Sequence, residues 1–398
     1  MSSIVSLFRN AYGGISREVW FLSLVMLINR AGTMVVAFLT VYTTQKLHFS
    51  VENAGYVMMS FGLGAVLGAW LGGKLTDIYG HYFVQFWSLL IGGSIFFVMS
   101  ELNSLISLCI CTFILAMFGE AYRPANTASI AHFSTPETFT RSVSLVRLAI
   151  NVGWAIGPAV GGFLASRDYT YLFWTDGVSN ILAAVLVWIF LRSKVEKKAK
   201  LSHEEKALNR SESPYKDTVF LVFIGFATFY AITFFPLFTV IPLFYKEVCM
   251  FSEQQIGILM GINGILVAVI EMVLIYKIEK KFTKLQFMTV GSILLVINYG
   301  LFLFFTSYSW MLVGIVFATA SEMFAMPFMN AFSMERAKAH NRGQYSALYA
   351  MTWSVSQVSA PLIGTQVIAN FGYDALWYLF GSFALIASLG FWWLRRLV

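Results

Sequence analysis

The sequence has 398 residues, of which 58% are hydrophobic and 12% charged, and its formal net charge is +7. Soluble proteins carry about 25% charged residues, so this composition excludes a soluble globular protein. The basic excess does not call for nucleic acid, because Lys and Arg also orient membrane proteins and contact anionic lipid. The three cysteines and the histidines show no spacing typical of a disulfide framework or a metal site, and no cofactor is expected.

Apolar runs of about 18–25 residues alternate with short polar breaks, which is the pattern of membrane-spanning helices. We predict twelve spans, with the shortest breaks around residues 100–105 and 306–309. The predicted spans cover residues 18–43, 53–75, 82–100, 104–131, 142–166, 170–192, 217–245, 254–277, 285–306, 308–331, 343–369 and 373–394.

The basic residues are distributed asymmetrically about these spans. Of the 27 Lys and Arg residues, three fall on one side and three inside spans, and all the others fall on the side of both termini. The exceptions are Lys46, Arg167 and Lys246 on the far side and Arg30, Arg123 and Arg147 within spans. The positive-inside rule makes the richer side cytoplasmic. We therefore expect an integral protein of a bacterial inner (plasma) membrane with both termini in the cytoplasm.

The first span carries a charge in an otherwise apolar run. Arg30 lies within "LINRAGTMVV", next to the polar Asn29. A charge near the centre of a bilayer is costly unless it is paired. We expect Arg30 to face an acid of another span, with Glu120 and Glu322 as the candidates. The alternative is a structural ion pair that only fixes helix orientation.

The loop between the second and third spans reads "GGKLTDIYGHY" and contains Gly73, Asp77 and Gly80. A glycine at Gly73 allows two membrane helices to approach closely. Asp77 lies at the cytoplasmic mouth, where a carboxylate can meet the positive N-terminal end of another helix.

The fourth span contains Glu120 close to mid-depth and Arg123 three residues later, and this spacing places them on one helix face. In the fifth span, Arg147 and Asn151 are four residues apart and share another face. Both arginines can alternatively extend to the cytoplasmic surface.

Further along the fifth span, "GWAIGPAVGG" places Gly157 and Pro158 where they would bend the helix and permit tight packing. The sixth span holds Asp176 near its outer end, where we expect it to be hydrated. The polar segment 193–216 follows, with the mixed Lys and Glu content of a solvated linker. It divides the chain into an N-terminal bundle, 1–192, and a C-terminal bundle, 217–398.

The second half contains three further candidates. Tyr230 belongs to an aromatic run in the seventh span, which indicates either a cavity wall or simple packing. Glu271 lies in the inner third of the eighth span and Glu322 near mid-depth in the tenth. The segments "FGEAYRPANTASIA" and "ASEMFAMPFMNAFS" each place a proline four or five residues after a glutamate, which suggests an internal six-plus-six repeat like that of secondary transporters.

These motifs resemble those of a known family. Gly73, Asp77 and Gly80 match the signature loop of the major facilitator superfamily, and the Gly157–Pro158 segment resembles the motif of its drug/proton antiporters. The resemblance implies an all-α membrane protein with twelve transmembrane helices in two six-helix pseudo-repeat bundles. It also implies that spans 1, 4, 7 and 10 line a central cavity, and that Asp77 contacts the start of span 11.

The expected function is secondary active transport by alternating access. No G-x-x-x-x-G-K-[ST] loop is present, so ATP is not the direct energy source. A buried carboxylate can bind and release a proton, which predicts a proton-coupled monomer that exports amphipathic small molecules and contacts membrane lipid. The alternatives are proton-coupled uptake of a peptide or sugar and, more remotely, a membrane-embedded enzyme or lipid-handling protein. No histidine pairs with a nucleophile in a recognisable catalytic motif, so an enzyme is not expected.

Two groups of residues summarise these predictions. The expected substrate and proton pathway comprises Arg30, Glu120, Arg123, Glu322, Glu271, Asn29, Arg147, Asn151 and Tyr230. The expected gating residues are Gly73, Asp77, Gly80, Gly157 and Pro158.

Overall fold

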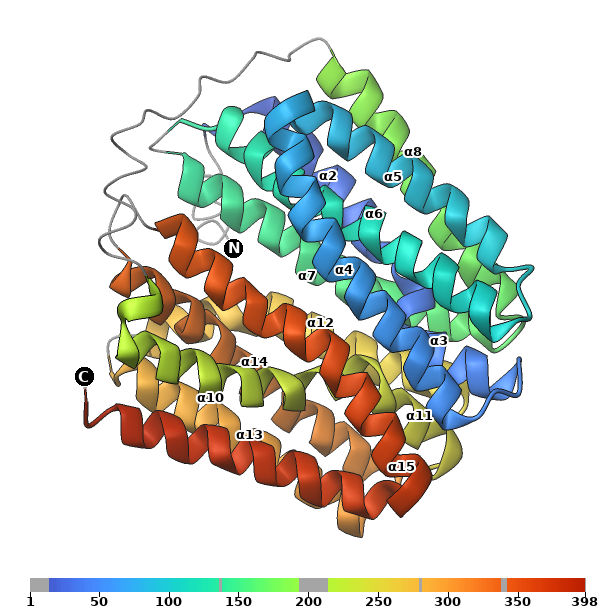
Figure 1. The fold of residues 1–398 in the computed structure, drawn as a ribbon, viewed down its shortest axis with the longest axis vertical. Helices are drawn as coiled ribbons and strands as arrows, with labels where there is room; N and C mark the ends of the chain where they lie inside the picture. The colour runs from blue at the N-terminus through green and yellow to red at the C-terminus, as the bar shows by residue number, and fades with distance from the viewer. Residues whose placement is uncertain (1–13, 136–137, 193–213, 279–280, 338–341, 398) are drawn as a thin grey trace, which may run out of the picture. The chain divides into compact units, whose positions relative to one another are not determined.

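The structure is a computed structural model that describes residues 14–135, 138–192, 214–278, 281–337 and 342–397 (Figure 1). The elements among these residues are helices, and they contain no strand. The linker predicted at 193–216 lies largely outside the described residues. The helices are α2 (Arg17–Ala31), α3 (Met34–Gln45), α4 (Val51–Tyr79), α5 (His81–Met99), α6 (Leu105–His132), α7 (Phe139–Ala165), α8 (Thr170–Leu191), η2 (Pro214–Lys216), α10 (Thr218–Phe234), η3 (Phe235–Phe238), α11 (Val240–Glu247), α12 (Glu253–Ile278), α13 (Lys284–Phe304), α14 (Tyr308–Arg336) and α15 (Arg342–Leu394).

The predicted spans are all found as helices. Among the described residues, eleven helical segments are long and apolar enough to cross a membrane. The eleventh and twelfth predicted spans both lie in α15, which contains a non-helical residue, Gly372, with φ of 82°. A positive φ is readily adopted by glycine, so the separation of these two spans coincides with a real break in the helix.

Two other predicted spans are interrupted. The first consists of α2 and α3, which are separated at Gly32, with φ of −89° and ψ of 46°. The seventh consists of α10, η3 and the start of α11. Pro236 lies in η3, and proline removes a backbone donor from a helix.

The chain divides into two compact units. Unit 1 contains residues 1–38 and 60–198, and unit 2 contains residues 39–59 and 199–398. Residues 39–59 belong with unit 2 because they contact its helices: the hydroxyl of Thr40 donates to the carbonyl of Thr239 at 2.7 Å. Gly55 also lies close to the side chain of Thr365 in α15, which is a second contact between this segment and the helices of unit 2.

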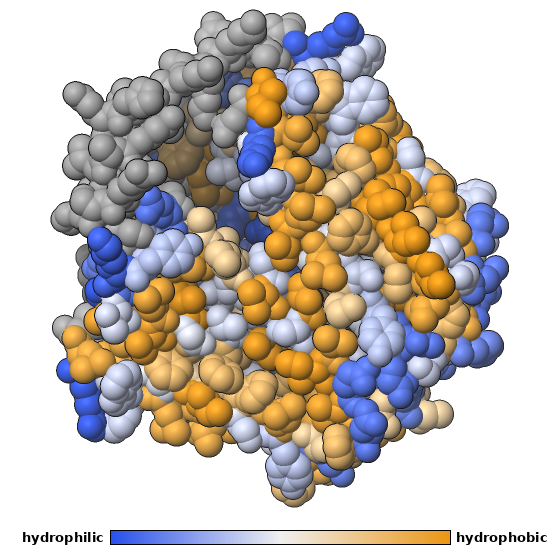
Figure 2. Space-filling model, viewed as in Figure 1, coloured by the Kyte–Doolittle hydropathy of each residue, from blue (hydrophilic) through white to orange (hydrophobic). Residues whose placement is uncertain are grey.

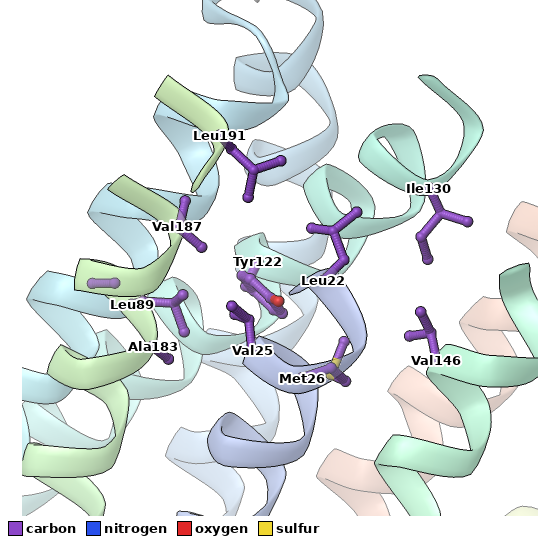
Figure 3. Packing of buried hydrophobic residues seen from close by; sticks show 11 residues of the cluster. Leu22, Val25, Met26, Leu89, Tyr122, Ile130, Val146, Ala183, Val187 and Leu191 are labelled. Carbon is purple, nitrogen blue, oxygen red and sulfur yellow. The ribbon is translucent and has the colours of Figure 1, made fainter. Parts of the chain in front are cut away.

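Unit 1 has an apolar core formed where α2, α5, α6, α7 and α8 pack together (Figure 3). Tyr122 of α6 is 1% exposed and lies among Val25 of α2, Leu89 of α5 and Val187 of α8. Each of these five helices contributes apolar side chains to this core, and this packing holds the polar groups of the same helices in fixed positions.

Unit 2 has a core rich in aromatic residues. The ring of Trp377 in α15 lies 5.0 Å from that of Phe244, 5.6 Å from that of Tyr299 and 4.9 Å from that of Phe302. Helices α11, α13 and α15 are thereby joined. Stacked and edge-to-face rings of this kind add to the stabilisation from buried area.

The surfaces of both units remain apolar along the flanks of the helices (Figure 2). Large side chains such as Ile106, Trp174 and Val269 are more than half exposed. Exposed apolar surface on this scale needs an apolar surrounding, which a lipid bilayer supplies. The chain is therefore an integral membrane protein.

Helices α2 and α10 are each capped at the N-terminus and tied to the end of another helix. In unit 1, Ser16 caps α2 and donates to the carbonyl of Phe133, which follows α6, at 2.8 Å. In unit 2, Asp217 caps α10 and accepts two hydrogen bonds from Arg336 at the end of α14, at 2.7 and 2.8 Å.

Candidate functional site

A small polar cavity of about 70 Å³ lies inside unit 1. Its wall includes Asn29 and Arg30 from α2, Gly32 and Thr33 from the break in the first span, and Glu120 from α6. A buried water needs roughly 10–15 Å³ on this scale, so the cavity has room for a few waters but not for a drug-sized molecule, which needs about 300–1,000 Å³.

Glu120 is the acid of this cavity, and its direct ion-pair partner is Arg123. The Nη1 atom of Arg123 lies 2.9 Å from Oε2 of Glu120, as the spacing of three residues predicts. The Glu120 side chain is 15% exposed, whereas that of Arg123 is 65% exposed. The charge of Arg30 also acts on Glu120, so the carboxylate lies between Arg30 on the cavity wall and Arg123, which is not part of that wall.

Arg30 therefore lines the same cavity as Glu120. The hydrogen bond of 2.9 Å to the Glu120 carboxylate is donated by Arg123 instead. The sequence offered Glu120 or Glu322 as the partner of Arg30, and the structure places Glu120 on the same cavity wall. Glu322 belongs to unit 2. Its relation to Arg30 stays a prediction.

Asn29 is also part of this wall. Its side-chain nitrogen donates to the side-chain oxygen of Asn180 in α8 at 2.7 Å, and both residues line the cavity. Buried polar groups are costly unless they are hydrogen-bonded. This pair satisfies that need and links α2 to α8.

Asp176 corrects an expectation from the sequence. It was expected to be hydrated, but it is 0% exposed. Its two carboxylate oxygens accept hydrogen bonds from the backbone N–H groups of Met34 at 3.2 Å and Val35 at 2.8 Å. Asp176 and Asn180 were not among the predicted site residues, although a polar pair spaced by four residues in an apolar span was a readable signal.

The Gly-Pro segment of α7 packs closely against the first span, as predicted for Gly157. A Cβ atom added at Gly157 would lie 3.0 Å from the carbonyl oxygen of Ala31. Helix α7 runs from Phe139 to Ala165 with Pro158 inside it. A gating role for Gly157 and Pro158 stays a prediction.

Arg147 and Asn151 lie elsewhere on α7. Arg147 is exposed and Asn151 is half-buried. Among the described residues, neither belongs to the wall of the polar cavity. Their part in a substrate or proton pathway stays a prediction.

The glycines in and before the signature loop differ in backbone conformation and in how closely other atoms approach them. Gly80 has φ of 87° and precedes α5, a conformation that favours glycine. A Cβ added at Gly73 would meet no atom within 4 Å in the part of the chain that the structure describes, so the expected close approach is not found there. It occurs instead at Gly72 and Gly68, where an added Cβ would lie 2.5 and 2.1 Å from backbone atoms of α6. The side chain of Asp77 is outside what the structure describes.

Unit 2 has its own polar group around Glu322. Asn263 of α12 donates to Oε2 of Glu322 at 3.3 Å and to the hydroxyl of Thr319 at 3.0 Å. Tyr230 is 0% exposed, and its hydroxyl lies 3.1 Å from that of Ser321. Its ring is thus packed within unit 2.

Glu271 of α12 is 4% exposed. Within the described residues, no group of His, Cys, Asp and Glu side chains has the arrangement of a metal site. The charged groups described here are carboxylates, which can take a proton, and guanidinium groups, which stay charged.

A second cavity of about 370 Å³ lies among α4, α5 and α6. It is lined mostly by apolar side chains, including Leu75, Trp87 and Phe118. Ser88 belongs to the walls of both cavities, so the polar and the apolar cavity are neighbours.

Several solved structures share this fold. A peptide transporter of the POT family bound to sulfate superposes with a TM-score of 0.81 at 14% identity, over 97% of this chain and 95% of that one. The nucleoside transporter NupG gives a TM-score of 0.78 at 12% identity, over 96% of this chain and all of that one. At this level of identity, these likenesses establish the fold alone.

Sequence relatives cover nearly the whole chain. A Na⁺, Li⁺, K⁺/H⁺ antiporter of Planococcus maritimus is 27% identical over 93% of both chains. Multidrug resistance protein 2 of Bacillus subtilis is 24% identical over 86% of both, and the class C tetracycline resistance protein of Escherichia coli is 25% identical over 81% of this chain and 80% of that one. Residues 20–361 match the family profile of the Major Facilitator Superfamily. The chain therefore belongs to the Major Facilitator Superfamily and is a membrane transporter of a small molecule, not an enzyme.

Proposed function

We propose that this transporter is a proton-coupled exporter of amphipathic small molecules that works as a monomer by alternating access. The observation that carries the proposal is Glu120, a largely buried carboxylate that shares a cavity with Arg30 and pairs with Arg123 at 2.9 Å. We further infer that it resides in a bacterial inner membrane with both termini in the cytoplasm.

Proton coupling follows from the charges in this cavity. A proton that binds to the Glu120 carboxylate removes its negative charge and breaks the ion pair with Arg123. Arg30, which lines the same cavity, then loses the nearby negative charge of Glu120, and this favours a rearrangement of α2 relative to α6. Arg30 cannot itself carry the proton, because a guanidinium group stays charged in proteins.

The substrate class follows from the adjacent cavities. The apolar cavity of about 370 Å³ has the volume of a small-molecule site. Its shared wall with the polar cavity suits a compound that is apolar over most of its surface and polar at one end. The multidrug and tetracycline resistance relatives support export as the direction.

A second candidate is exchange of an alkali cation for protons, which the Planococcus relative favours. A bare cation at Glu120 would be repelled by Arg30 and Arg123. Such exchange would therefore have to use another acid, with Glu271 and Glu322 as the candidates. Glu322 also remains our candidate for a second proton-binding residue in the export mechanism.

Transport in everted membrane vesicles tests the proposal. Vesicles with an imposed proton gradient are loaded with acridine orange, and tetraphenylphosphonium, NaCl or KCl is added. We expect tetraphenylphosphonium to release protons from vesicles that contain the wild-type chain. Glu120→Gln should abolish this proton release while leaving exchange of labelled tetraphenylphosphonium measurable.

Glu101→Gln serves as the matched control, because Glu101 is exposed and lies between α5 and α6. It should behave like the wild type. Proton release by NaCl or KCl alone would favour cation exchange instead. Normal gradient-driven transport by Glu120→Gln would remove Glu120 from the coupling mechanism.

A further inference from the structure

The break in the first span leaves backbone groups that need partners within the membrane. Helix α2 ends at Ala31 and α3 begins at Met34. The first N–H groups of a helix have no acceptor inside that helix. Met34 and Val35 are 4% and 1% exposed, so another part of the protein has to supply an acceptor for their N–H groups.

Asp176 of α8 supplies that acceptor. One carboxylate oxygen accepts from the N–H of Met34 at 3.2 Å, and the other accepts from the N–H of Val35 at 2.8 Å. The positive end of α3 also favours a negative charge at this point. The fully buried carboxylate is therefore stabilised by the start of α3 rather than by a basic side chain.

Asn180, one turn later on α8, binds the other side of the break. Its side-chain nitrogen contacts the carbonyl of Gly32 at 3.5 Å and donates to the carbonyl of Asp176 at 2.8 Å. Its side-chain oxygen accepts from Asn29 at 2.7 Å. One face of α8 thus holds both the end of α2 and the start of α3.

The break is also confined sterically. A Cβ added at Gly32 would lie 1.8 Å from the Oγ atom of Ser179 in α8. On the α7 side, a Cβ added at Gly153 would lie 2.5 Å from the Cβ of Arg30. The backbone around Gly32 therefore lies closely packed between two helices, with little room to shift.

We propose that Asp176 and Asn180 are positioning residues that fix the break at Gly32 and thereby hold Arg30 on the wall of the polar cavity beside Glu120. Broken membrane helices occur at the substrate and ion sites of transporters. Arg30 lies just before the end of α2, so a displacement of the break would move its guanidinium group relative to Glu120. The inference rests on the proposed function only for its transport test.

The first test reads the break directly and does not depend on transport. Hydrogen exchange is measured on the purified protein in lipid nanodiscs, in peptides that cover residues 33–38. Asp176→Asn keeps the size of the side chain but can accept only through one oxygen. We expect exchange of the Met34 and Val35 amides to become at least tenfold faster, while Glu101→Gln leaves it unchanged. Unchanged exchange in Asp176→Asn would overturn the proposal.

The second test asks whether the break acts through Arg30. If the wild type transports tetraphenylphosphonium, we expect Asp176→Asn to raise its KM several-fold at equal amounts of inserted protein. We expect the double variant with Arg30→Lys to be no worse than Arg30→Lys alone. A lower Vmax with unchanged KM in Asp176→Asn would contradict the positioning role. So would a double variant whose KM is raised by the product of the two single effects.

A third variant guards against misfolding. If Asp176→Asn does not insert, Asn180→Ala is used, because it removes the contact with Asn29 and leaves the Asp176 carboxylate in place. Because Asp176 still accepts from the Met34 and Val35 amides in this variant, their exchange should rise less than in Asp176→Asn, whereas the KM should rise several-fold, and a normal KM would overturn the proposal. Absence of any transport by the wild type would instead contradict the proposed function, and the exchange test would still decide the role of Asp176.

Discussion

At the scale of single residues, Asp217 shows how one carboxylate joins several helices. It caps α10 through the Phe220 amide at 3.1 Å, accepts from Arg336 of α14 and accepts from the Tyr345 hydroxyl of α15 at 3.1 Å. Burial alone would raise the pKa of Asp217, but the hydrogen bonds and the charge of Arg336 outweigh it and hold the pKa below its usual value. The ionised form is thus the one that stabilises unit 2.

Replacing Asp217 by Asn should destabilise the protein by about 1–3 kcal/mol, because hydrogen bonds to a charged group are lost and Arg336 is left without its carboxylate. The pH dependence has a defined sign. Since the pKa is lower in the folded state, the stabilisation is present above the unfolded pKa of about 4 and is lost as pH falls through the folded pKa. Thermal unfolding of the purified protein measured from pH 7 to pH 3 should show this loss in the wild type but a smaller one in Asp217→Asn. If the wild type and Asp217→Asn lost the same stability on acidification, the ionised Asp217 carboxylate would not have the stabilising role proposed here.

Cys249, which follows α11, offers a second test at this scale. Burial raises the pKa of its thiol to about 12. The thiolate is the reactive form, so Cys249 should react with maleimide at pH 7.5 on the order of a thousandfold more slowly than an unperturbed thiol of pKa about 8.5. The labelling rate, measured by mass spectrometry, should rise about tenfold per pH unit up to at least pH 9.5. A rate that levels off below pH 9 would contradict the burial of this thiol.

At the scale of elements, helix α4 depends on closely spaced glycines. Cβ atoms added at Gly64, Gly68 and Gly72 would lie 2.1, 2.1 and 2.5 Å from backbone atoms of α6. Small residues at such spacing let membrane helices approach closely. The contact joins α4 to the helix that carries Glu120.

We expect Gly68→Ala to destabilise unit 1, by about 1–3 kcal/mol or more, because the added methyl would collide with backbone that cannot move aside. Gly73→Ala is the matched control on the same helix, since its Cβ would meet no described atom within 4 Å. Thermal stability of the two variants in detergent should separate them clearly. Equal stability would show that α4 can move away from α6 at little cost.

The sequence could predict helices better than it could predict their interruptions. Changes in hydropathy are abrupt at the ends of spans, so the predicted 170–192 and the observed Thr170–Leu191 nearly coincide. The break at Gly32 lies within one predicted span, and no change in hydropathy separates α2 from α3. It is fixed by Asp176, whose contacts with the first span join residues 141 and 142 positions apart. A contact between residues so far apart in the sequence cannot be predicted from the hydropathy pattern of one span.

The same distinction applies to the site. The pairing of Glu120 with Arg123 could be predicted, because it depends on a spacing of three residues within one helix. The cavity that Arg30 and Glu120 share depends on how α2 and α6 pack. From the sequence alone, the partner of Arg30 could be narrowed only to two candidate acids, Glu120 and Glu322. The interpretation of Asp176 as hydrated was wrong because depth along a span does not tell which face of the helix is covered.

At the scale of the whole molecule, the two halves of the sequence use corresponding contacts. Ser16 caps α2 and Asp217 caps α10, and each binds the end of the fourth span of its half, at Phe133 and Arg336 respectively. This correspondence supports the internal repeat that the sequence suggested. Duplicated halves of this kind are common in secondary transporters, and here the two copies use different chemistry for one structural task.

The topology of the whole chain gives the final prediction. The single-cysteine variants Gln45→Cys and Ser202→Cys are prepared with Cys109, Cys111 and Cys249 replaced by serine. In intact cells, a membrane-impermeant maleimide should label Gln45→Cys, which is exposed at the end of α3, and should not label Ser202→Cys. In everted vesicles the result should reverse.

The physical reason is the distribution of basic residues. The segment around position 202 is rich in Lys and Arg, whereas the segment around position 45 holds only Lys46, and positively charged loops stay on the cytoplasmic side. Labelling of both variants after detergent treatment is the control for thiol reactivity. If Ser202→Cys is labelled from outside intact cells, the orientation is inverted. The positive-inside rule would then fail for this chain, and both termini would lie outside the cytoplasm.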